Sequence, residues 1–377
     1  MKISALQDRI RALLDKLPRR PRFSLPGWLR FKLPSWLRFK LPGWLRFKLP
    51  GGTWRTVVVA LAVYLLLATV AGLYWSITPA PSDMPRDSRG YLVQNGAGPV
   101  TGSATTAALM AVVETLLEKP GGYIRNDRLP PGLWLDNMPN WEYGALIQSR
   151  DLARAMREAY SRSQSQSTED PDLAMAEPLL NFNANSWLIP SSEGEYRDAL
   201  RHLDNYLERL TDGDEQNAQF YSRADNLAYW LVTVETRLGS LSQRLSASVG
   251  QRRLNTDLAG DAEASQATPA PGENMVETPM LELDDVFYEA RGASWALIHF
   301  LKAAQLDFAE VLEKKNALVS LRQIVRELEA TQHKVYSPII LNGSGFGLLA
   351  NHSLVMASYI SRANAAIIDL RGLLSDG

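Results

Sequence analysis

A glycine-rich loop near the C-terminus, Asn342 to Gly347 (NGSGFG), is the stretch whose composition comes nearest to a catalytic or phosphate-binding loop. Backbone amides of a glycine loop that precedes a helix can bind a phosphate group. However, no Lys followed by Ser or Thr comes after this loop and no predicted strand comes before it, as a nucleotide-binding loop requires. A nucleophilic serine elbow needs glycine two residues before and two after the serine, whereas Ser344 has Asn342 and Phe346 there. We therefore interpret the loop as a flexible turn between helices.

The residues that most often bind metals are not spaced for that role. The chain has four histidines, His202, His299, His333 and His352. No two of them stand three or four residues apart, as zinc ligands on one helix do. Cysteine is absent, which excludes disulfides, thiolate metal sites and cysteine nucleophiles. We predict no metal ion and no cofactor.

Paired carboxylates could act as a general acid and base, but their positions favour a simpler role. The pairs Glu193/Glu195 and Asp284/Asp285 lie where helices are predicted to begin. Carboxylates in a first turn stabilise the helix through its dipole. We therefore predict no catalytic residue and a protein that is not an enzyme.

An aromatic and proline-rich stretch between residues 120 and 143 is the most unusual part of the chain after residue 100. It holds the aromatic residues Tyr123, Trp134, Trp141 and Tyr143. Such a stretch either packs on a helical bundle as a rigid plug or forms a recognition surface. It is our candidate interaction loop, and Asn140 is predicted to cap the helix that follows it.

One apolar segment, residues 56–77 (TVVVALAVYLLLATVAGLYWSI), is predicted to fix the rest of the chain relative to a membrane. Its 22 residues carry no charge and no proline, and a helix of that length covers the ~30 Å hydrocarbon core of a bilayer. Aromatic and basic residues that suit the membrane interface flank it: Trp54, Arg55, Tyr74 and Trp75. The basic region before it is too long for a cleaved signal peptide, so we predict an uncleaved signal anchor, a transmembrane helix.

The charge distribution predicts the orientation of that helix. Residues 1–55 carry 14 Lys and Arg against two acids, Asp8 and Asp15, whereas the rest of the chain has 26 basic and 39 acidic residues. Basic flanks remain in the cytoplasm. The sequence therefore predicts a single-pass protein of a bacterial inner membrane, with a cytoplasmic N-terminus and a periplasmic C-terminal domain.

The basic arm, residues 1–55, contains a tandem repeat of eight residues, LPGWLRFK, LPSWLRFK and LPGWLRFK. Each copy supplies a tryptophan (Trp28, Trp36 and Trp44) and two cations. Tryptophan at headgroup level and cations near anionic lipid suit the membrane surface. Two other interpretations are a site for single-stranded nucleic acid, which the nearby membrane makes unlikely, and a recent duplication with little selected role.

The remaining chain is predicted to be mainly α-helical, a periplasmic helical bundle. A Pro-, Gly- and Ser-rich tether covers residues 78–102. The first part of the helical domain covers 103–254 and the second 281–377, and apolar residues recur in both every three or four positions. Between them, 255–280 is rich in Ala, Pro, Gly and acid, which predicts a disordered insert.

Long stretches of the chain resemble a known family. They are LPPGLWLDNMPNWEYGALIQSRDLARAMR, SRSQSQSTEDPDL, EYR, and QFYSRADNLAYWL followed by RLGSLSQRLSASVG. In this order they resemble a family of single-pass inner-membrane proteins of proteobacteria that is catalogued as a domain of unknown function. The resemblance covers Thr56 to the C-terminus and leaves out the repeat arm. It implies a location and a domain boundary, and no activity.

These observations favour an inner-membrane-anchored envelope protein whose helical domain serves as an interaction or scaffold module. Its predicted partners are the lipid bilayer, anionic lipid at the arm, and an envelope protein. Two alternatives stay open, a periplasmic enzyme acting on cell-envelope substrates through a cleft by the aromatic loop, and a membrane sensor. An enzyme should show a pocket with convergent polar groups. A binding module should instead show an exposed apolar patch.

Overall fold

The computed structural model describes residues 53–81, 100–162, 168–214, 217–254, 273–337, 339–344 and 347–375. The chain divides into two compact units, Met1–Ala62 and Val63–Gly377. Three predicted features lie wholly or mostly outside the described residues: the repeat arm with Trp28, Trp36 and Trp44, most of the 78–102 tether, and residues 255–272 of the insert.

The apolar segment forms one helix, α2 (Thr53–Trp75). Among the described residues it is the one helix long and apolar enough to cross a membrane, over Thr56–Trp75. Most of its large side chains are exposed, which differs from a core helix of a soluble protein. By length and composition it could be a membrane span or a signal anchor. Trp54 and Arg55 lie in its first turn and Tyr74 and Trp75 in its last.

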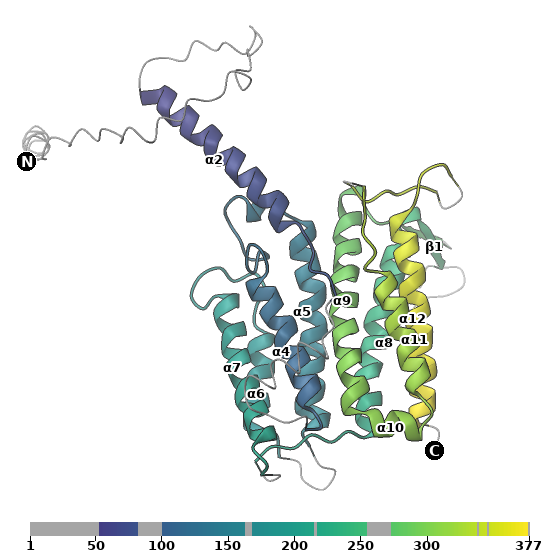
Figure 1. Ribbon diagram of the computed structural model, residues 1–377. Coiled ribbons are helices and arrows are strands. Elements are labelled where there is room, and N and C mark those ends of the chain that lie inside the picture. Colours follow the sequence, from purple (N-terminus) through teal and green to yellow (C-terminus); the bar gives the residue numbers. More distant parts are fainter. Residues whose placement is uncertain are drawn as a thin grey trace, which may run out of the picture. The chain divides into compact units, whose positions relative to one another are not determined.

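The chain after the tether is a bundle of helices, as the apolar periodicity predicts (Figure 1). The elements are α4 (Ser103–Glu118), α5 (Asn137–Ala155) with a π-helical turn (Met156–Tyr160), α6 (Pro171–Leu180), α7 (Ser192–Thr211), α8 (Ala224–Ser246), α9 (Leu283–Asp307), α10 (Ala309–Lys314), α11 (Leu318–Ala330) and α12 (His352–Ser375). Short 3-10 turns cover Gly132–Trp134, Ala247–Val249 and Met280–Glu282. The mainly α fold class is therefore as predicted.

Side chains at the helix starts account for several of these boundaries. The Ser191 hydroxyl accepts a hydrogen bond from the Gly194 amide, as the predicted helix start at residues 191–195 requires. Asp170 accepts from two amides at the start of α6, next to Pro171 at the first helical position. The prediction for α5 was wrong by four residues: Asp136 caps it, and Asn140 instead donates to Asp285 at 2.6 Å.

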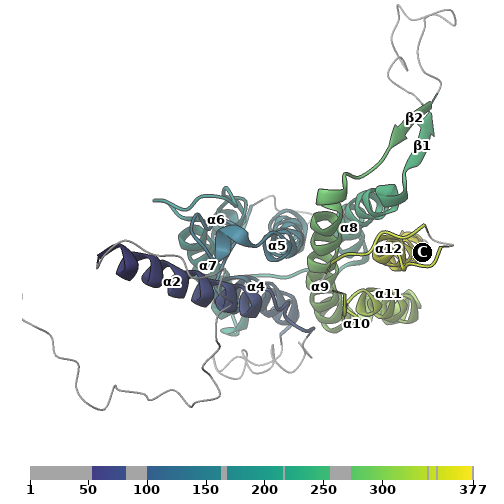
Figure 2. The same ribbon diagram turned by 90° about the horizontal axis from the view of Figure 1, so that it is seen from above.

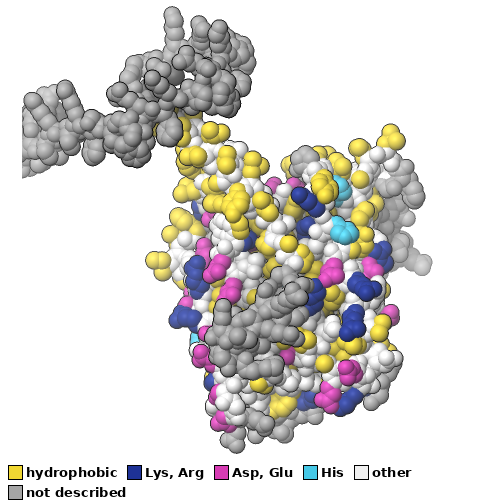
Figure 3. Space-filling view, in the orientation of Figure 1, with side chains coloured by type: hydrophobic (Ala, Val, Ile, Leu, Met, Phe, Trp, Pro, Cys, Tyr) yellow, Lys and Arg dark blue, Asp and Glu magenta, His cyan; other side chains and the backbone are white. Residues whose placement is uncertain are grey.

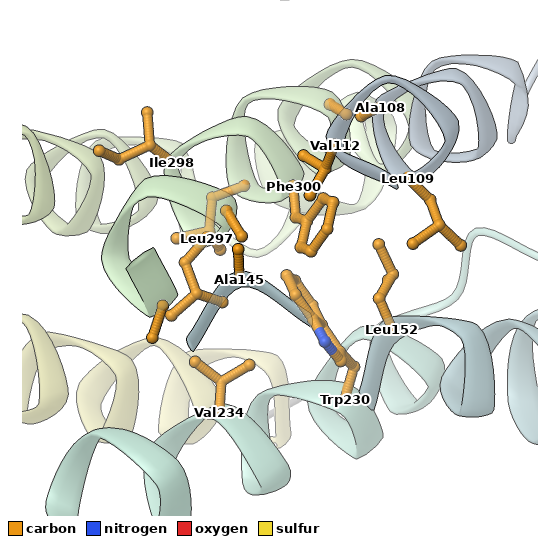
Figure 4. Packing of buried hydrophobic residues seen from close by; sticks show 14 of the residues in the cluster. Ala108, Leu109, Val112, Ala145, Leu152, Trp230, Val234, Leu297, Ile298 and Phe300 are labelled. Atoms are coloured by element: carbon orange, nitrogen blue, oxygen red, sulfur yellow. The ribbon is translucent and has the colours of Figure 1, made fainter. Parts of the chain in front are cut away.

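The helices pack in two layers, seen nearly end-on in Figure 2. Helices α4 to α7 form one layer, and α8, α9, α11 and α12 form the other. The layers meet along α5 and α9, and one continuous cluster of buried apolar side chains runs through both. Figure 4 shows Leu109, Leu152, Trp230 and Phe300 converging within it from α4, α5, α8 and α9. The two helical blocks of the sequence therefore share one core.

Two glycines allow α5 and α9 to approach at backbone distance. A Cβ atom on Gly292 would overlap the carbonyl oxygen of Trp141, and one on Gly144 would overlap that of Glu289. Trp141 and Trp295 pack beside this crossing with ring centroids 5.0 Å apart. The crossing therefore requires glycine at both positions.

A short antiparallel hairpin was not predicted. Strands β1 (Gln251–Leu254) and β2 (Glu273–Val276) pair, with Gln251 opposite Val276. In the sequence they stand on either side of residues 255–272 of the predicted insert, which lie outside the described residues. Their four-residue runs are too short to show alternation against the polar sequence around them.

Candidate functional site: the apolar end of the bundle

The helices alternate in direction, so their connections gather at two ends of the bundle (Figure 1). The described residues of one end, here called the apolar end, are 119–136, 181–191, 247–254, 273–282, 331–337, 339–344 and 347–351. Hydrogen bonds join these connections: Asn126 donates to the Ser186 carbonyl oxygen at 2.7 Å, and Asn342 donates to that of Ser248 at 2.7 Å. The described residues of the other end, the polar end, are 100–102, 156–162, 168–170, 212–214, 217–223 and 307–317. There the Tyr221 amide donates to the Tyr160 carbonyl oxygen at 2.7 Å.

Large apolar side chains stand exposed at the apolar end. They are Leu129, Leu133, Trp134, Trp187, Leu188, Ile189, Val249, Met275, Val276, Met280, Leu281, Tyr336, Ile339, Leu348 and Leu349. Ile189 is 100% exposed and Leu281 is 89% exposed, so these are not the edges of core residues. Among the described residues of the polar end, only Val100 is comparably apolar and exposed. In Figure 3 hydrophobic side chains protrude at the upper end of the bundle, and charged side chains cover its sides.

An exposed apolar patch of this kind marks a contact surface. Folding does not account for it, because a connection between helices can be made of polar residues, as the polar end shows. The geometry can therefore support binding to something apolar, through side chains that project from fixed loops.

Buried polar groups hold the first of these loops in place. The Glu142 carboxylate, fully buried on α5, accepts hydrogen bonds from the amides of Ile124 (2.9 Å) and Arg125 (2.8 Å) and pairs with Lys119 at 2.5 Å. Burial raises the pKa of Glu142, and Lys119 and the two amides oppose that rise. A buried carboxylate with this many donors fixes the base of the loop while its tip stays exposed.

A second loop is fixed against the first. The Tyr123 hydroxyl donates to the Ala184 carbonyl oxygen at 3.0 Å, and Asn126 also donates to Glu193 at 2.8 Å. The Ser192 hydroxyl donates to the Asn183 carbonyl oxygen at 2.7 Å. The two tips, Leu129–Trp134 and Trp187–Ile189, are therefore presented together by a polar framework.

The four residues of the predicted interaction loop are divided between core and surface. Tyr123 and Trp141 are buried, and Tyr123 packs edge-on against Tyr196. Tyr143 is half-buried, with the Arg125 guanidinium 4.2 Å from its ring centre. Trp134 is half-exposed and belongs to the apolar end. Of the four, Trp134 is the residue placed to meet a partner.

Sequence reasoning missed most of the apolar end. Residues 182–190 (FNANSWLIP) were interpreted as an extended connection between helices, and the run Trp-Leu-Ile within it is a signal that could have marked an exposed apolar tip. Met280, Leu281, Leu348 and Leu349 had no such signal, because each pair adjoins a helix whose apolar pattern it continues.

Two contacts within the unit Val63–Gly377 involve the C-terminal part of α2. The Tyr64 hydroxyl donates to the Pro130 carbonyl oxygen at 2.9 Å. The Trp75 ring lies so close to Gly121 that a Cβ there would overlap it. Both partners, Gly121 and Pro130, belong to the apolar end.

The histidines and carboxylates that we considered as candidate chemical groups lie in separate parts of the fold. His202 on α7 contacts Asp172 on α6 at 3.0 Å, in an ion network that joins the two helices. His299 is buried in α9, where burial lowers its pKa to about 4. Asp285 accepts from Asn140 at a helix start, and burial raises its pKa. Within the described ranges no group of three His, Asp or Glu could hold a metal ion.

Fold and site together define a class: an α-helical protein with one apolar helix that could span or anchor in a membrane, and a bundle with one apolar end. The chain belongs to the family described as "Uncharacterized protein conserved in bacteria (DUF2333)", whose model matches residues 48–377. The resemblance placed the start of the family region at Thr56, whereas the match begins eight residues earlier, at Lys48, and leaves residues 1–47 outside. No curated protein and no solved structure matches the chain.

Proposed function

We propose that this protein is a single-span protein of the bacterial inner membrane whose periplasmic bundle rests with its apolar end on the outer surface of the same membrane. In this arrangement α2 is the anchor and the basic arm stays in the cytoplasm, held at anionic lipid. The bundle is an interaction or scaffold domain: the bilayer occupies one end, and its charged sides remain for an envelope protein.

The observation that carries the proposal is the gathering of exposed apolar side chains at one end. Trp134 and Trp187 have the amphipathic rings that favour the headgroup region, and Leu133, Leu188 and Ile189 project beside them. Burying one such side chain contributes about 1.5–3 kcal/mol. Trp75, at the C-terminal end of α2, lies against Gly121, and Tyr64, eleven residues further into the proposed span, contacts Pro130. In the proposed arrangement the tip of the first loop therefore enters the outer half of the bilayer beside α2, which supports the bilayer, rather than a soluble partner, as the occupant.

The absence of cysteine makes a direct test available, because any introduced cysteine is the only thiol. Full-length Ile189→Cys, Leu348→Cys and Val319→Cys would each be labelled with an environment-sensitive dye and placed in nanodiscs containing lipids with a quencher on the acyl chain. Val319 is the matched control: it is 72% exposed and lies at the start of α11, next to the polar end. We expect quenching at positions 189 and 348 and none at 319.

The same variants test the orientation. A thiol reagent that cannot cross the inner membrane should label Val319→Cys in cells with a permeabilised outer membrane. Protection of that cysteine until the inner membrane is broken would contradict the periplasmic location. Equal quenching at all three positions, or at none, would contradict the contact between the apolar end and the bilayer.

A further inference from the structure

A pocket opens at the apolar end between the start of α9, the end of α11 and the start of α12. Its volume is about 450 Å³, within the ~300–1,000 Å³ of small-molecule sites. Apolar side chains form much of its wall, among them Phe287, Leu341, Val355 and Met356. None of the described residues that line it is acidic.

A buried arginine lies in the wall. Arg291 is 8% exposed and donates to the carbonyl oxygens of Gln332 (2.8 Å) and His333 (2.8 Å), at the C-terminal end of α11. Its Nε has no hydrogen-bond partner, and among the described residues no carboxylate pairs with the guanidinium. Carbonyl oxygens account for the side chain's position but leave its charge uncompensated, and buried charges are normally paired.

Further donors surround the opening. Lys334 and His333 are exposed at the pocket, and His352 lies half-buried across from them. The Nδ1 atom of His352 accepts from the Leu341 amide at 3.2 Å, so the proton of the neutral ring is on Nε2, which can donate. Tyr336 and Tyr359 add hydroxyl groups to the lining. The pocket therefore offers positive charge and hydrogen-bond donors above an apolar wall.

We propose that this pocket binds an anionic amphiphile: a molecule with a phosphate or carboxylate head, held by Arg291, Lys334 and the histidines, and a short apolar part against Phe287, Val355 and Met356. A phosphate or carboxylate supplies the charge that Arg291 lacks, and an apolar chain fits the wall that no polar ligand would cover. This inference goes beyond the contact with the bilayer, because a pocket can take up such a molecule whichever way the bundle is turned.

The test uses the full-length protein in phosphatidylcholine nanodiscs and a dihexanoyl phosphatidic acid with a photoreactive diazirine on one acyl chain. After irradiation, peptides that carry the probe are mapped by mass spectrometry. We expect labelling within residues 331–341 and 352–359. Unlabelled dihexanoyl phosphatidic acid should compete at concentrations at least tenfold below those needed for dihexanoyl phosphatidylcholine or inorganic phosphate.

Two exposed substitutions probe the pocket without disturbing the core. Lys334→Gln should weaken competition about fivefold, the effect of about 1 kcal/mol for one cation at an anionic head. Val355→Trp should reduce labelling at least tenfold by filling the pocket. Lys314→Gln makes the same charge change on an exposed lysine of the polar end and should alter neither labelling nor competition by more than twofold.

Three outcomes would overturn the proposal. Labelling spread evenly over the apolar end would indicate partition into the bilayer alone. Competition by inorganic phosphate equal to that by phosphatidic acid would indicate a plain anion site, and equal competition by phosphatidylcholine would remove the role of the charge. Each is independent of the quenching experiment, so failure of the pocket and failure of the membrane contact are distinguishable.

Discussion

The two ends of the bundle both connect neighbouring helices, but they differ in which side chains they bury and which they expose. At the polar end the large aromatic rings are turned inward: Tyr160, Phe220 and Phe308 pack against one another with centroids 5.1–5.7 Å apart. The surface there carries charges, such as Arg209 between Asp170 and Asp172. At the apolar end polar groups are buried at the base of the loops, as Glu142 is, and Ile189 or Leu281 face outward. The arrangement of polar and apolar groups is thus reversed, which indicates that the outward apolar groups serve contact and not folding.

The largest expected effect is the difference in unfolding free energy between removing a buried aromatic ring at the polar end and removing an exposed one at the apolar end. Phe308→Ala empties a fully buried site at the polar end and should lower the free energy of unfolding by about 3–5 kcal/mol. Trp134→Ala, a larger truncation at an exposed site, should change it by only about 0.5 kcal/mol. Denaturant unfolding of the full-length variants measures both. Similar losses for the two would mean that the tip of the first loop is part of the core.

A smaller effect is expected from the ion network of the polar end. Burial would raise the pKa of Asp172, but hydrogen bonds from His202, Arg209 and Asn205 outweigh it and hold the pKa below its ordinary value. The network therefore stabilises the fold above the ordinary carboxyl pKa of ~3.9, and this contribution is lost as the pH falls through the lower pKa of the folded state.

Arg209→Gln should remove about 1–2 kcal/mol at pH 7 and less at acid pH, where Asp172 is protonated in both proteins. The melting temperatures of the wild type and the variant should therefore converge between pH 6 and pH 2.5. Arg201→Gln, an exposed change on the same helix, is the control. A difference that stays constant across this range would show that Arg209 acts through packing alone.

The smallest effect on stability is expected at the apolar end, together with a clear effect on contact. Changing Trp187, Leu188 and Ile189 together to Gln should shift the unfolding free energy by about 0.5 kcal/mol or less, because all three are exposed. In the same protein the quenching of a dye at Leu348→Cys by acyl-chain quenchers should fall at least twofold. Unchanged quenching would show that the second loop does not contribute to the membrane contact.

The sequence predicted the helices well and the surface poorly, for one physical reason. Helical periodicity identifies the buried stripe of α7, where Tyr196, Leu203 and Tyr206 are all buried, and cap residues identify its start. Both signals are local. Whether an apolar side chain outside a stripe is buried depends on contacts between distant segments, such as the bond from Asn342 to Ser248. Trp141 and Trp187 both follow an Asn or Ser in a polar stretch, and only the fold distinguishes them.

The same limit applies to the pocket. Arg291 stands in an ordinary helical pattern (YEARGASW), and nothing in that pattern shows that its side chain reaches the end of α11. His333 and Lys334 are separated from His352 in sequence by the glycine-rich loop, which we interpreted only as a turn. The pocket depends on the placement of Leu341 and the start of α12 beside α9, which no local pattern shows.

The crossing at Gly144 and Gly292 bears on how the molecule can move. Where two backbones touch without side chains between them, neither helix can slide along the other without its carbonyl groups colliding with the neighbouring chain. The two layers are therefore locked in register at their crossing, and a load applied at one end of the bundle would be carried by the whole block of helices rather than by either layer alone.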